Sequence, residues 1–318
     1  MNELLRIENL RKTYVTRAGG GKKVPVAAVD DVSFSVGKGE TLGLVGESGC
    51  GKSTLGRSIL RLVEPDSGRI VFGGADITRA DMRPYRRKMQ IVLQDPAGSL
   101  DPRSTVAEIV SEGLRAAGVR SAAERRARAE AMLARVGLSR CLDRYPHEFS
   151  GGQQQRIGIA RALMVEPQFL VCDEPVSALD VSCQAQIVNL LCELQKDLAL
   201  TYLFISHDLS VVRYVSDRIA VMYLGRILEL GPTAALCDAP AHPYTRELIA
   251  AIPVPDPARY QGAPVPPADP PEDFAPAGGC RFRPRCPQAA AECAADQPLR
   301  EISPGHWAAC CKAASPAI

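Results

Sequence analysis

The sequence lacks any long run of apolar residues. None of its 318 residues falls in a stretch of about 18 uninterrupted apolar side chains, the length that a membrane-spanning helix needs. The first residues, MNELLRIENLRKTY, carry charges throughout, so we expect no signal peptide there. We therefore expect the chain to stay in the cytosol, where any work at a membrane would require a partner that spans it.

The sequence also lacks an excess of either charge. Its 38 Lys and Arg residues against 36 Asp and Glu residues leave a net charge of +2. Dedicated nucleic-acid binders carry a strong basic field, so this balance argues against that class. A hydrophobic content of 46% is ample for a sizeable core, in one large domain or a large one with a smaller one.

Short apolar segments alternate with helical patterns. Residues 169–175 (FLVCDEP) and 201–207 (TYLFISH) are almost continuously apolar, which is typical of strands buried on both faces of a parallel sheet. We expect a helix from Gly51 through residue 63 and a helical insertion over residues 111–136. The last predicted strands are residues 218–225 and 226–231. Glycine and lysine at residues 17–23 predict a loop, and the proline-rich residues 252–279 predict a linker.

The segment GESGCGKST fits the phosphate-binding pattern G-x-x-x-x-G-K-[ST] between an apolar strand and a helix. Glycines let backbone amides turn toward phosphates, and the start of the helix adds partial positive charge. We expect Lys52 to hold the β- and γ-phosphates of ATP and Ser53 to bind Mg²⁺. The predicted ATP contacts are Gly46, Glu47, Ser48, Gly49, Cys50, Gly51, Lys52, Ser53 and Thr54.

Two carboxylates, Asp173 and Glu174, end a predicted buried strand. Such a pair is costly there unless it meets a cation or takes part in chemistry. We expect Asp173 to serve Mg²⁺ and Glu174 to polarise the attacking water as a general base. The alternative is a pair of exposed turn residues before Pro175. His207 ends the next strand and is positioned either to sense the γ-phosphate or to play a structural part.

The string FSGGQQQRIGIARAL, residues 149–163, resembles the signature motif of ABC ATPases. Its Ser150 comes 98 positions after Lys52 and 23 before Asp173, as in that family. A Ser hydroxyl, glycine amides and a helix start form a second anion site, which the resemblance assigns to a partner's ATP. The residues concerned are Ser150, Gly151, Gly152 and Gln153.

Further residues resemble family elements in the expected order. Tyr14 resembles the aromatic that stacks on adenine, and Gln94 resembles the glutamine that contacts Mg²⁺ and faces the membrane subunits. Asp180 resembles the aspartate of the dimer interface, and His207 resembles the switch histidine. The resemblance implies a P-loop NTPase of the α/β class, with a RecA-like core, an antiparallel β subdomain and a helical subdomain. It covers residues 1–250, with the helical part at about 95–165.

A narrower resemblance is to the dipeptide and oligopeptide importer family, and within it to the second of two unequal ATPase subunits. The strings QDPAGSLDPR, YPHEFSGG and AHPYTRELIAAIP carry it. It implies an ATPase held peripherally on the cytoplasmic face of the inner membrane. The implied partners are a second ATPase subunit of a different chain, two transmembrane permease subunits and an extracytoplasmic substrate-binding protein. Two residues depart from the family pattern: Asp101 stands where Asn is common, and Gln154 where Arg is common.

Other functions stay open at this point. The cargo of such an importer could instead be a nickel chelate, glutathione or a sugar. A soluble ABC ATPase acting on nucleic acid would usually carry two sets of motifs or a much longer insertion. A non-catalytic subunit would carry a degenerate acid pair or signature, and both are intact here.

Five cysteines gather after residue 279. Cys280, Cys286, Cys293 and Cys310 are spaced 6, 7 and 17 apart, and without a C-x-x-C pair a simple zinc ribbon fits poorly. In the importer family this segment resembles a ligand set for a [4Fe–4S] cluster. Unliganded thiols and zinc remain alternatives. Cys311 adjoins Cys310, and the resemblance of the ending GHWAAC favours Cys310.

Three arginines lie among these cysteines. We expect Arg281, Arg283 and Arg285 to offset the negative charge of the cluster. With the linker, the cysteines make residues 251–318 a separate carboxy-terminal region.

Overall fold

The computed structural model describes residues 3–17, 23–252 and 278–313 of the chain. The predicted loop at residues 18–22 and the predicted linker at residues 253–277 lie outside this part. The structure consists of two units. The first comprises Met1–Leu5, Val36–Thr41 and Phe72–Ser206, and the second comprises Arg6–Ser35, Leu42–Val71 and His207–Ile318.

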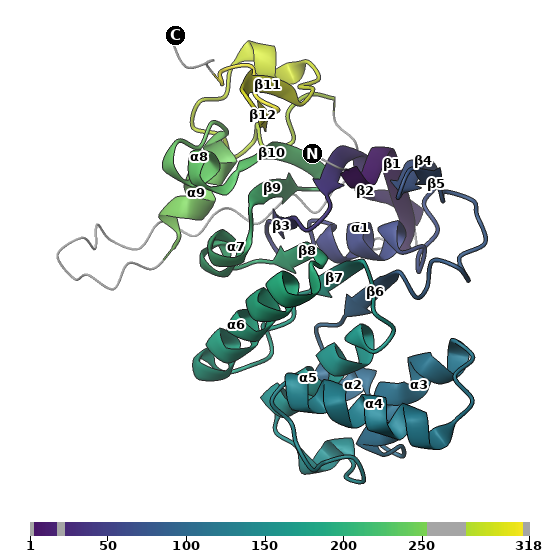
Figure 1. The fold of residues 1–318 in the computed structure, drawn as a ribbon. Helices are drawn as coiled ribbons and strands as arrows, with labels where there is room; N and C mark the ends of the chain where they lie inside the picture. Colours follow the sequence, from purple (N-terminus) through teal and green to yellow (C-terminus); the bar gives the residue numbers. More distant parts are fainter. Residues whose placement is uncertain (1–2, 18–22, 253–277, 314–318) are drawn as a thin grey trace, which may run out of the picture. The chain divides into compact units, whose positions relative to one another are not determined.

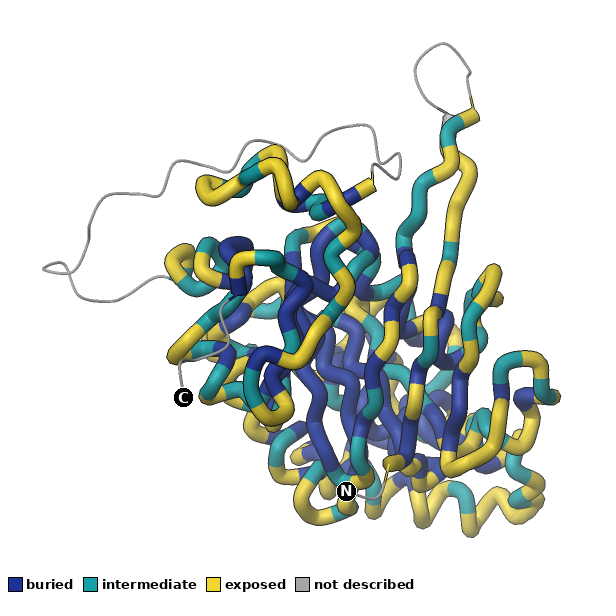
Figure 2. Tube along the Cα trace, turned by 90° about the horizontal axis from the view of Figure 1, so that it is seen from above, coloured by how far each residue is buried: buried dark blue, intermediate teal, exposed yellow. Residues whose placement is uncertain are grey.

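Three parallel strands form the sheet of the first unit, in the order β8 (Thr201–Ser206), β7 (Phe169–Asp173) and β6 (Met89–Val92). Every residue of β7 and β8 is buried, as their apolar sequences predict, and Figure 2 shows the core strands in dark blue. In register, Phe169 lies beside Met89 on one side and Thr201 on the other. The short β5 (Ala75–Asp76) belongs to the same unit.

Helices gather beside one another in this unit (Figure 1). They are α2 (Pro96–Ser99), α3 (Val106–Ala116), α4 (Ala122–Arg135), the 3₁₀ turn η1 (Pro146–Glu148) and α5 (Gly151–Leu163). α3 packs against α4 and α5. Thr105 caps α3 in a capping box with Glu108, and Ser121 caps α4, so each helix begins where a side chain satisfies its first free amides. The predicted insertion is thus two helices, separated at Gly118. The longer α6 (Val181–Leu198) follows β7.

In the second unit, the strand order is β11 (Arg300–Ser303), β12 (His306–Ala308), β10 (Arg226–Pro232), β9 (Arg218–Tyr223) and β3 (Thr41–Val45). β3 is parallel to β9, and the other pairs are antiparallel. The same unit holds most of a second sheet, with β1 (Glu3–Arg17) between β2 (Lys23–Gly37) and β4 (Ser67–Phe72). Its helices are α1 (Lys52–Ile59), α7 (Leu209–Val215), α8 (Thr233–Asp238), α9 (Pro243–Ala250) and the 3₁₀ turn η3 (Ala291–Ala294).

Two expectations about elements were wrong. The helix after Gly51 ends at Ile59 instead of residue 63, because Arg61 adopts a left-handed conformation (φ 52°) that an α-helix cannot contain. The last strands of the chain are not residues 218–231, since β11 and β12 follow them. β12 pairs with β10, with Ala308 beside Glu229, so the carboxy-terminal region extends a sheet.

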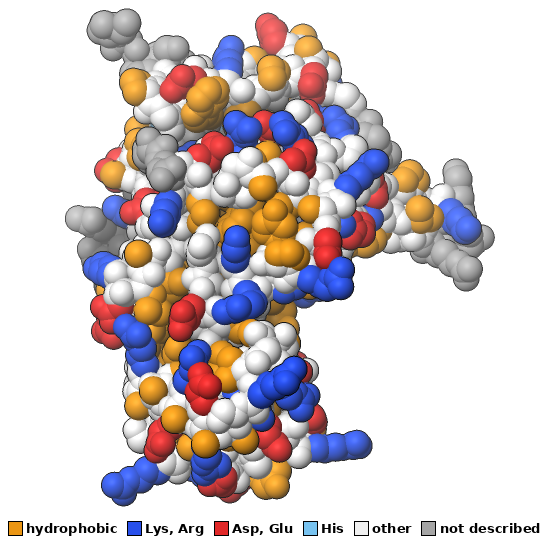
Figure 3. Space-filling view, turned by 45° about the vertical axis from the view of Figure 1, so that its right-hand side comes forward, with side chains coloured by type: hydrophobic (Ala, Val, Ile, Leu, Met, Phe, Trp, Pro, Cys, Tyr) orange, Lys and Arg blue, Asp and Glu red, His pale blue; other side chains and the backbone are white. Residues whose placement is uncertain are grey.

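Charged side chains of both signs are interspersed on the face of the molecule shown in Figure 3. This mixture agrees with the near-zero net charge of the sequence. Within the described residues, no helix is both long and apolar enough to cross a membrane.

Candidate nucleotide site

The phosphate-loop segment connects β3 to α1 in the second unit. Gly51 has φ 108°, and a Cβ there would lie 1.9 Å from the carbonyl oxygen of Ala28. A Cβ on Gly46 would lie 2.0 Å from the carbonyl oxygen of Met222. Any side chain at either position would therefore displace neighbouring backbone, which explains why the loop needs glycine there.

Lys52 is the first residue of α1, and the residue is only 4% exposed. Its Nζ donates hydrogen bonds to the carbonyl oxygens of Gly46 (2.7 Å) and Glu47 (2.8 Å). These bonds satisfy a buried ammonium group that would otherwise be costly. Ser53 and Thr54 follow in the first helical turn and are half-buried. The loop thus places a cation and a helix start together, the chemistry of an anion site.

The acid pair lies in the first unit, at the end of β7. Asp173 is buried and Glu174 is half-buried. Glu174 has φ 47°, a left-handed conformation that costs a non-glycine residue about 1 kcal/mol and is concentrated at functional sites. Its amide donates to the carbonyl oxygen of Ile205 (3.0 Å), which helps to hold this conformation.

The structure brings two predicted catalytic residues together. Gln94, two residues beyond β6, donates from Nε2 to Oε2 of Glu174 at 3.1 Å. The two are 80 residues apart in the sequence and meet because β6 and β7 are neighbouring parallel strands. The bond orients the carboxylate of Glu174 at the carboxyl end of the sheet, where ligands bind in folds of this class.

The signature string starts α5, also in the first unit. Ser150 caps the helix: its Oγ accepts from the amide of Gln153 (3.4 Å), and the side chain of Gln153 accepts from the amide of Ser150 (3.0 Å). Gln154 donates to the carbonyl oxygens of Pro146 (2.9 Å) and Phe149 (3.2 Å), so this departure from the family pattern holds the segment before the signature.

Asp180 caps α6 close to the signature helix. Its carboxylate accepts from Oγ of Ser182 (2.7 Å) and the amide of Cys183 (2.9 Å), and these bonds lower the pKa of Asp180 to about 2. A Cβ on Gly152 would lie 3.3 Å from Sγ of Cys183, and one on Gly151 would lie 3.4 Å from a methyl carbon of Leu179. The starts of α5 and α6 are therefore in contact, and both glycines leave room for a close neighbour.

Two further predicted residues are exposed. Tyr14 lies on β1 and is 40% exposed, with Nζ of Lys12 5.7 Å from its ring centroid. His207 follows β8 directly and precedes Asp208, which caps α7. Their exposure leaves both side chains accessible to a nucleotide, and their roles stay predictions.

The five clustered cysteines line one cavity in the second unit, together with His242 and Arg283. Sγ of Cys293 lies 3.7 Å from Sγ of Cys311, and burial raises the pKa of the Cys280 and Cys286 thiols. The described part of the chain contains no group of three or more His, Cys, Asp or Glu residues arranged to hold a metal ion. The predicted ligands are therefore neighbours, but they are not gathered around one point.

Two of the three arginines expected to offset the charge of the cluster bind carboxylates elsewhere. Arg281 bonds to Asp30 and to the carbonyl oxygen of Leu224, and Arg285 bonds to Glu47 and Glu247. Arg283 alone among the three lines the cysteine cavity. The sequence contained no signal for the contact between Glu47 and Arg285, because 238 positions separate them.

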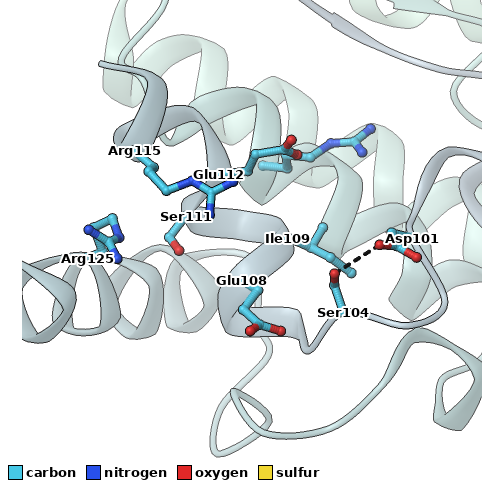
Figure 4. Close-up of a pocket in the computed structure, with 9 residues that line it drawn as sticks. Asp101, Ser104, Glu108, Ile109, Ser111, Glu112, Arg115 and Arg125 are labelled. Atoms are coloured by element: carbon cyan, nitrogen blue, oxygen red, sulfur yellow. Dashed lines mark hydrogen bonds between the residues drawn. The ribbon is translucent and has the colours of Figure 1, made fainter. Parts of the chain in front are cut away.

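A separate cavity of about 380 Å³ lies among the helices of the first unit (Figure 4). Its charged lining residues are Asp101, Glu108, Glu112, Arg115, Arg125 and Arg161. Asp101, the second departure from the family pattern, accepts from Oγ of Ser104 (3.0 Å) and from the amide of Arg103 (3.0 Å). These bonds lower the pKa of Asp101 and close the turn before α3. The balanced charge of the cavity selects no single kind of ligand.

Known proteins resemble the chain along most of its length. Residues 29–177 match the ABC transporter family, and residues 228–293 match the oligopeptide/dipeptide transporter C-terminal region. A Brucella ovis protein with a peptide-import ATP-binding name is 53% identical over 96% of this chain and 97% of its own. The oligopeptide transport ATP-binding protein OppF of Bacillus subtilis is 55% identical over 80% of this chain and 84% of its own.

Solved structures of ATP-binding cassettes share the fold. CbiO1 of Clostridium perfringens, part of the transporter complex CbiONQ, has a TM-score of 0.65 at 30% identity over 75% of this chain and 92% of its own. The dimeric cassette MJ0796, in a post-hydrolysis state with ADP and Pi, has a TM-score of 0.64 at 30% identity over 72% and 99%. The predicted P-loop α/β fold class is confirmed.

Proposed function

Because the chain belongs to the ATP-binding subunits of ABC transporters, in the dipeptide and oligopeptide importer family, we propose that it powers the import of dipeptides or oligopeptides. Its activity is that of the family, ATP hydrolysis coupled to transport. The observation that carries the proposal for the chemistry is the hydrogen bond between Gln94 and Glu174 at the end of β7.

The phosphate loop would bind the triphosphate. Lys52 is already held inside the loop, from which its ammonium group can turn to the β- and γ-phosphates. Tyr14 would stack on adenine, and His207 would contact the γ-phosphate. The amides of residues 46–54 would neutralise charge that develops as the phosphoryl group transfers.

Mg²⁺ would be held by Ser53, Gln94 and Asp173. Hydroxyl, amide and carboxylate oxygens are the donors that this hard cation prefers, so the residues fit it. The bound ion would neutralise charge on the phosphates. The remaining work falls to the protein: Gln94 orients Glu174, and Glu174 takes a proton from the attacking water.

Replacing Glu174 by Gln tests this assignment. The Glu174→Gln chain should bind ATP as the wild type does and lose turnover by at least about a hundredfold, because the amide cannot accept the proton. Single-turnover hydrolysis and equilibrium nucleotide binding measure the two effects. Glu193→Gln, at an exposed position of α6, is the matched control and should hydrolyse normally. Hydrolysis at the wild-type rate in Glu174→Gln would remove Glu174 from the role of base.

The signature would act on ATP held by a second subunit. Ser150, Gly151, Gly152 and Gln153 would face the partner's γ-phosphate, with Asp180 near the contact between the subunits. Support comes from the start of α5, where Gly151 is exposed and Gly152 is half-buried beside Cys183. We infer that the second ATPase is a different chain, because the sequence resembles one of two unequal subunits.

The complex would also contain two transmembrane permease subunits and an extracytoplasmic substrate-binding protein, with this chain peripheral on the cytoplasmic face of the inner membrane. Names of relatives support peptide as the cargo. Purification of the complex, followed by ligand screening of its binding protein, tests this against nickel chelates, glutathione and sugars.

A [4Fe–4S] cluster on Cys280, Cys286, Cys293 and Cys310 completes the proposal. The support for it is chemical: five thiols line one cavity, and four thiolates are the donor set that such a cluster takes. When bound, it would crosslink the segments that carry its ligands. We place this region in a second domain, residues 251–318, after an ATPase domain of residues 1–250.

A further inference from the structure

The carboxy-terminal cysteine segment contacts the phosphate loop through Arg285. Nη1 of Arg285 lies 2.8 Å from Oε1 and 3.0 Å from Oε2 of Glu47, and Nη2 bonds to Glu247 on α9. The Arg285 side chain is only 6% exposed. A guanidinium group shared by two carboxylates at a buried position is a strong, directional contact.

Aromatic rings fix the position of this arginine. Its guanidinium carbon lies 5.5 Å from the ring centroid of Phe282 and 5.7 Å from that of Tyr223. Phe282 is fully buried, with its centroid 5.4 Å from that of Tyr244. Packing therefore restrains the Arg285 side chain before any nucleotide binds. Less conformational entropy of this side chain is then lost when it binds Glu47.

Glu47 is held at both its backbone and its side chain. Its amide donates to the hydroxyl of Tyr244 at 3.0 Å, and its carboxylate is bound by Arg285. Burial alone would lower the pKa of Arg285, but the hydrogen bonds to Glu47 and Glu247 outweigh it and raise that pKa. The arginine thus stays charged throughout the physiological pH range.

The charge of Glu47 matters because this residue lies inside the loop that takes the triphosphate. An unpaired carboxylate there would repel the phosphates and leave the loop free to move. We propose that Arg285 is a positioning residue of the nucleotide site, which neutralises Glu47 and so lets the carboxy-terminal segment control ATP affinity. Arg285 directly precedes Cys286, so a displacement of the cysteine segment would also move the arginine that binds Glu47.

This inference rests on ATP binding at the loop and does not require a metal at the cysteines. Replacing Arg285 by Met keeps a long apolar stem and removes the charge. The full chain with Arg285→Met should bind MgATP about tenfold more weakly, while kcat at saturating ATP changes less than twofold. Arg246→Met, at an exposed position of α9, is the matched control and should bind as the wild type does.

Repeating the substitution in Glu47→Gln chains distinguishes the loss of a specific effect on Glu47 from a general loss of structure. In Glu47→Gln chains there is no carboxylate to neutralise, so adding Arg285→Met should weaken MgATP binding by less than about twofold further. If Arg285→Met does not fold, Arg285→Lys replaces it, with an expected loss of about threefold that also disappears with Glu47→Gln. Unchanged affinity in the Arg285 variant, or an equal loss in both backgrounds, would overturn the inference. Failure of the wild type to bind MgATP would instead reject the proposed function.

Discussion

At the scale of a single residue, the surroundings of His242 change its protonation. It lies at the start of α9, is 1% exposed, and accepts the amide hydrogen of Tyr244 on Nδ1 at 3.0 Å. Burial lowers the pKa of His242 to about 4, so the folded chain keeps the ring neutral at physiological pH. Protonation would put a charge in this buried place and remove the acceptor that caps the helix.

A pH dependence of stability follows. The unfolded chain takes up a proton at His242 below about pH 6.5, whereas the folded chain does so only near pH 4. This residue should therefore remove about 3 kcal/mol of unfolding free energy as the pH falls across that window. Urea unfolding at several pH values measures it, with His242→Asn, which can still cap the helix, as the control. Equal slopes in the two chains would contradict the assignment.

Among the elements, the signature helix α5 depends on the segment before it. Gln154 binds two carbonyl oxygens in that segment, those of Pro146 and Phe149. At the start of α5 itself, Ser150 and Gln153 form a capping box. The conformation of the segment and the orientation of the helix start are thus set by the same few hydrogen bonds.

Removing the side-chain amide of Gln154 should destabilise the start of α5. Gln154→Ala removes the side-chain donor to two carbonyl oxygens, of which that of Pro146 still accepts from the amide of Phe149, and we expect a loss of about 1 kcal/mol in unfolding free energy together with slower ATP hydrolysis. Urea unfolding and steady-state ATPase assays check the two effects. Gln186→Ala on α6, whose side chain makes one long hydrogen bond of 3.4 Å with Arg156, should change neither. A stability equal to that of the wild type would show that the segment keeps its shape without Gln154.

For the whole molecule, the carboxy-terminal region is a structural part of the second unit. β12 extends the sheet beside β10, His306 lies 2.7 Å from the buried carboxylate of Glu229, and Arg281 bonds to Asp30. Burial alone would raise the pKa of Asp30, but the bond from Arg226 and the charges of three arginines outweigh it and lower that pKa. The region is anchored by backbone pairing, by the hydrogen bond between His306 and Glu229, and by the buried ion pair of Arg281 with Asp30.

The metal content of the intact chain tests the proposed cluster. Anaerobic purification should yield about four iron atoms and about four acid-labile sulfides per chain, with loss of both in Cys286→Ser. Cys311→Ser should keep the cluster if Cys310 is the fourth ligand. Cys237→Ser, outside the cavity, is the control. Stoichiometric zinc without iron would reject the iron–sulfur proposal.

Much of the candidate site could be predicted from the sequence because the motifs that form it are local. The phosphate loop, the acid pair and the signature each depend on neighbouring residues that must turn, cap or end a strand together. The apolar runs of β7 and β8 indicated buried parallel strands for the same reason. Helix ends were less predictable. The end at Ile59 depends on the left-handed conformation of Arg61, which the identity of this residue does not predict.

The sequence by itself determined the fold class and the family, and it predicted the residues that would meet ATP, because each rests on a short pattern with its own physical requirement. Only the tertiary structure decided which distant residues meet. Gln94 reaches Glu174 because two strands are neighbours, and Arg285 reaches Glu47 because the cysteine segment packs on the aromatic residues beside α9. Such contacts depend on the packing of the whole chain, which no local pattern encodes.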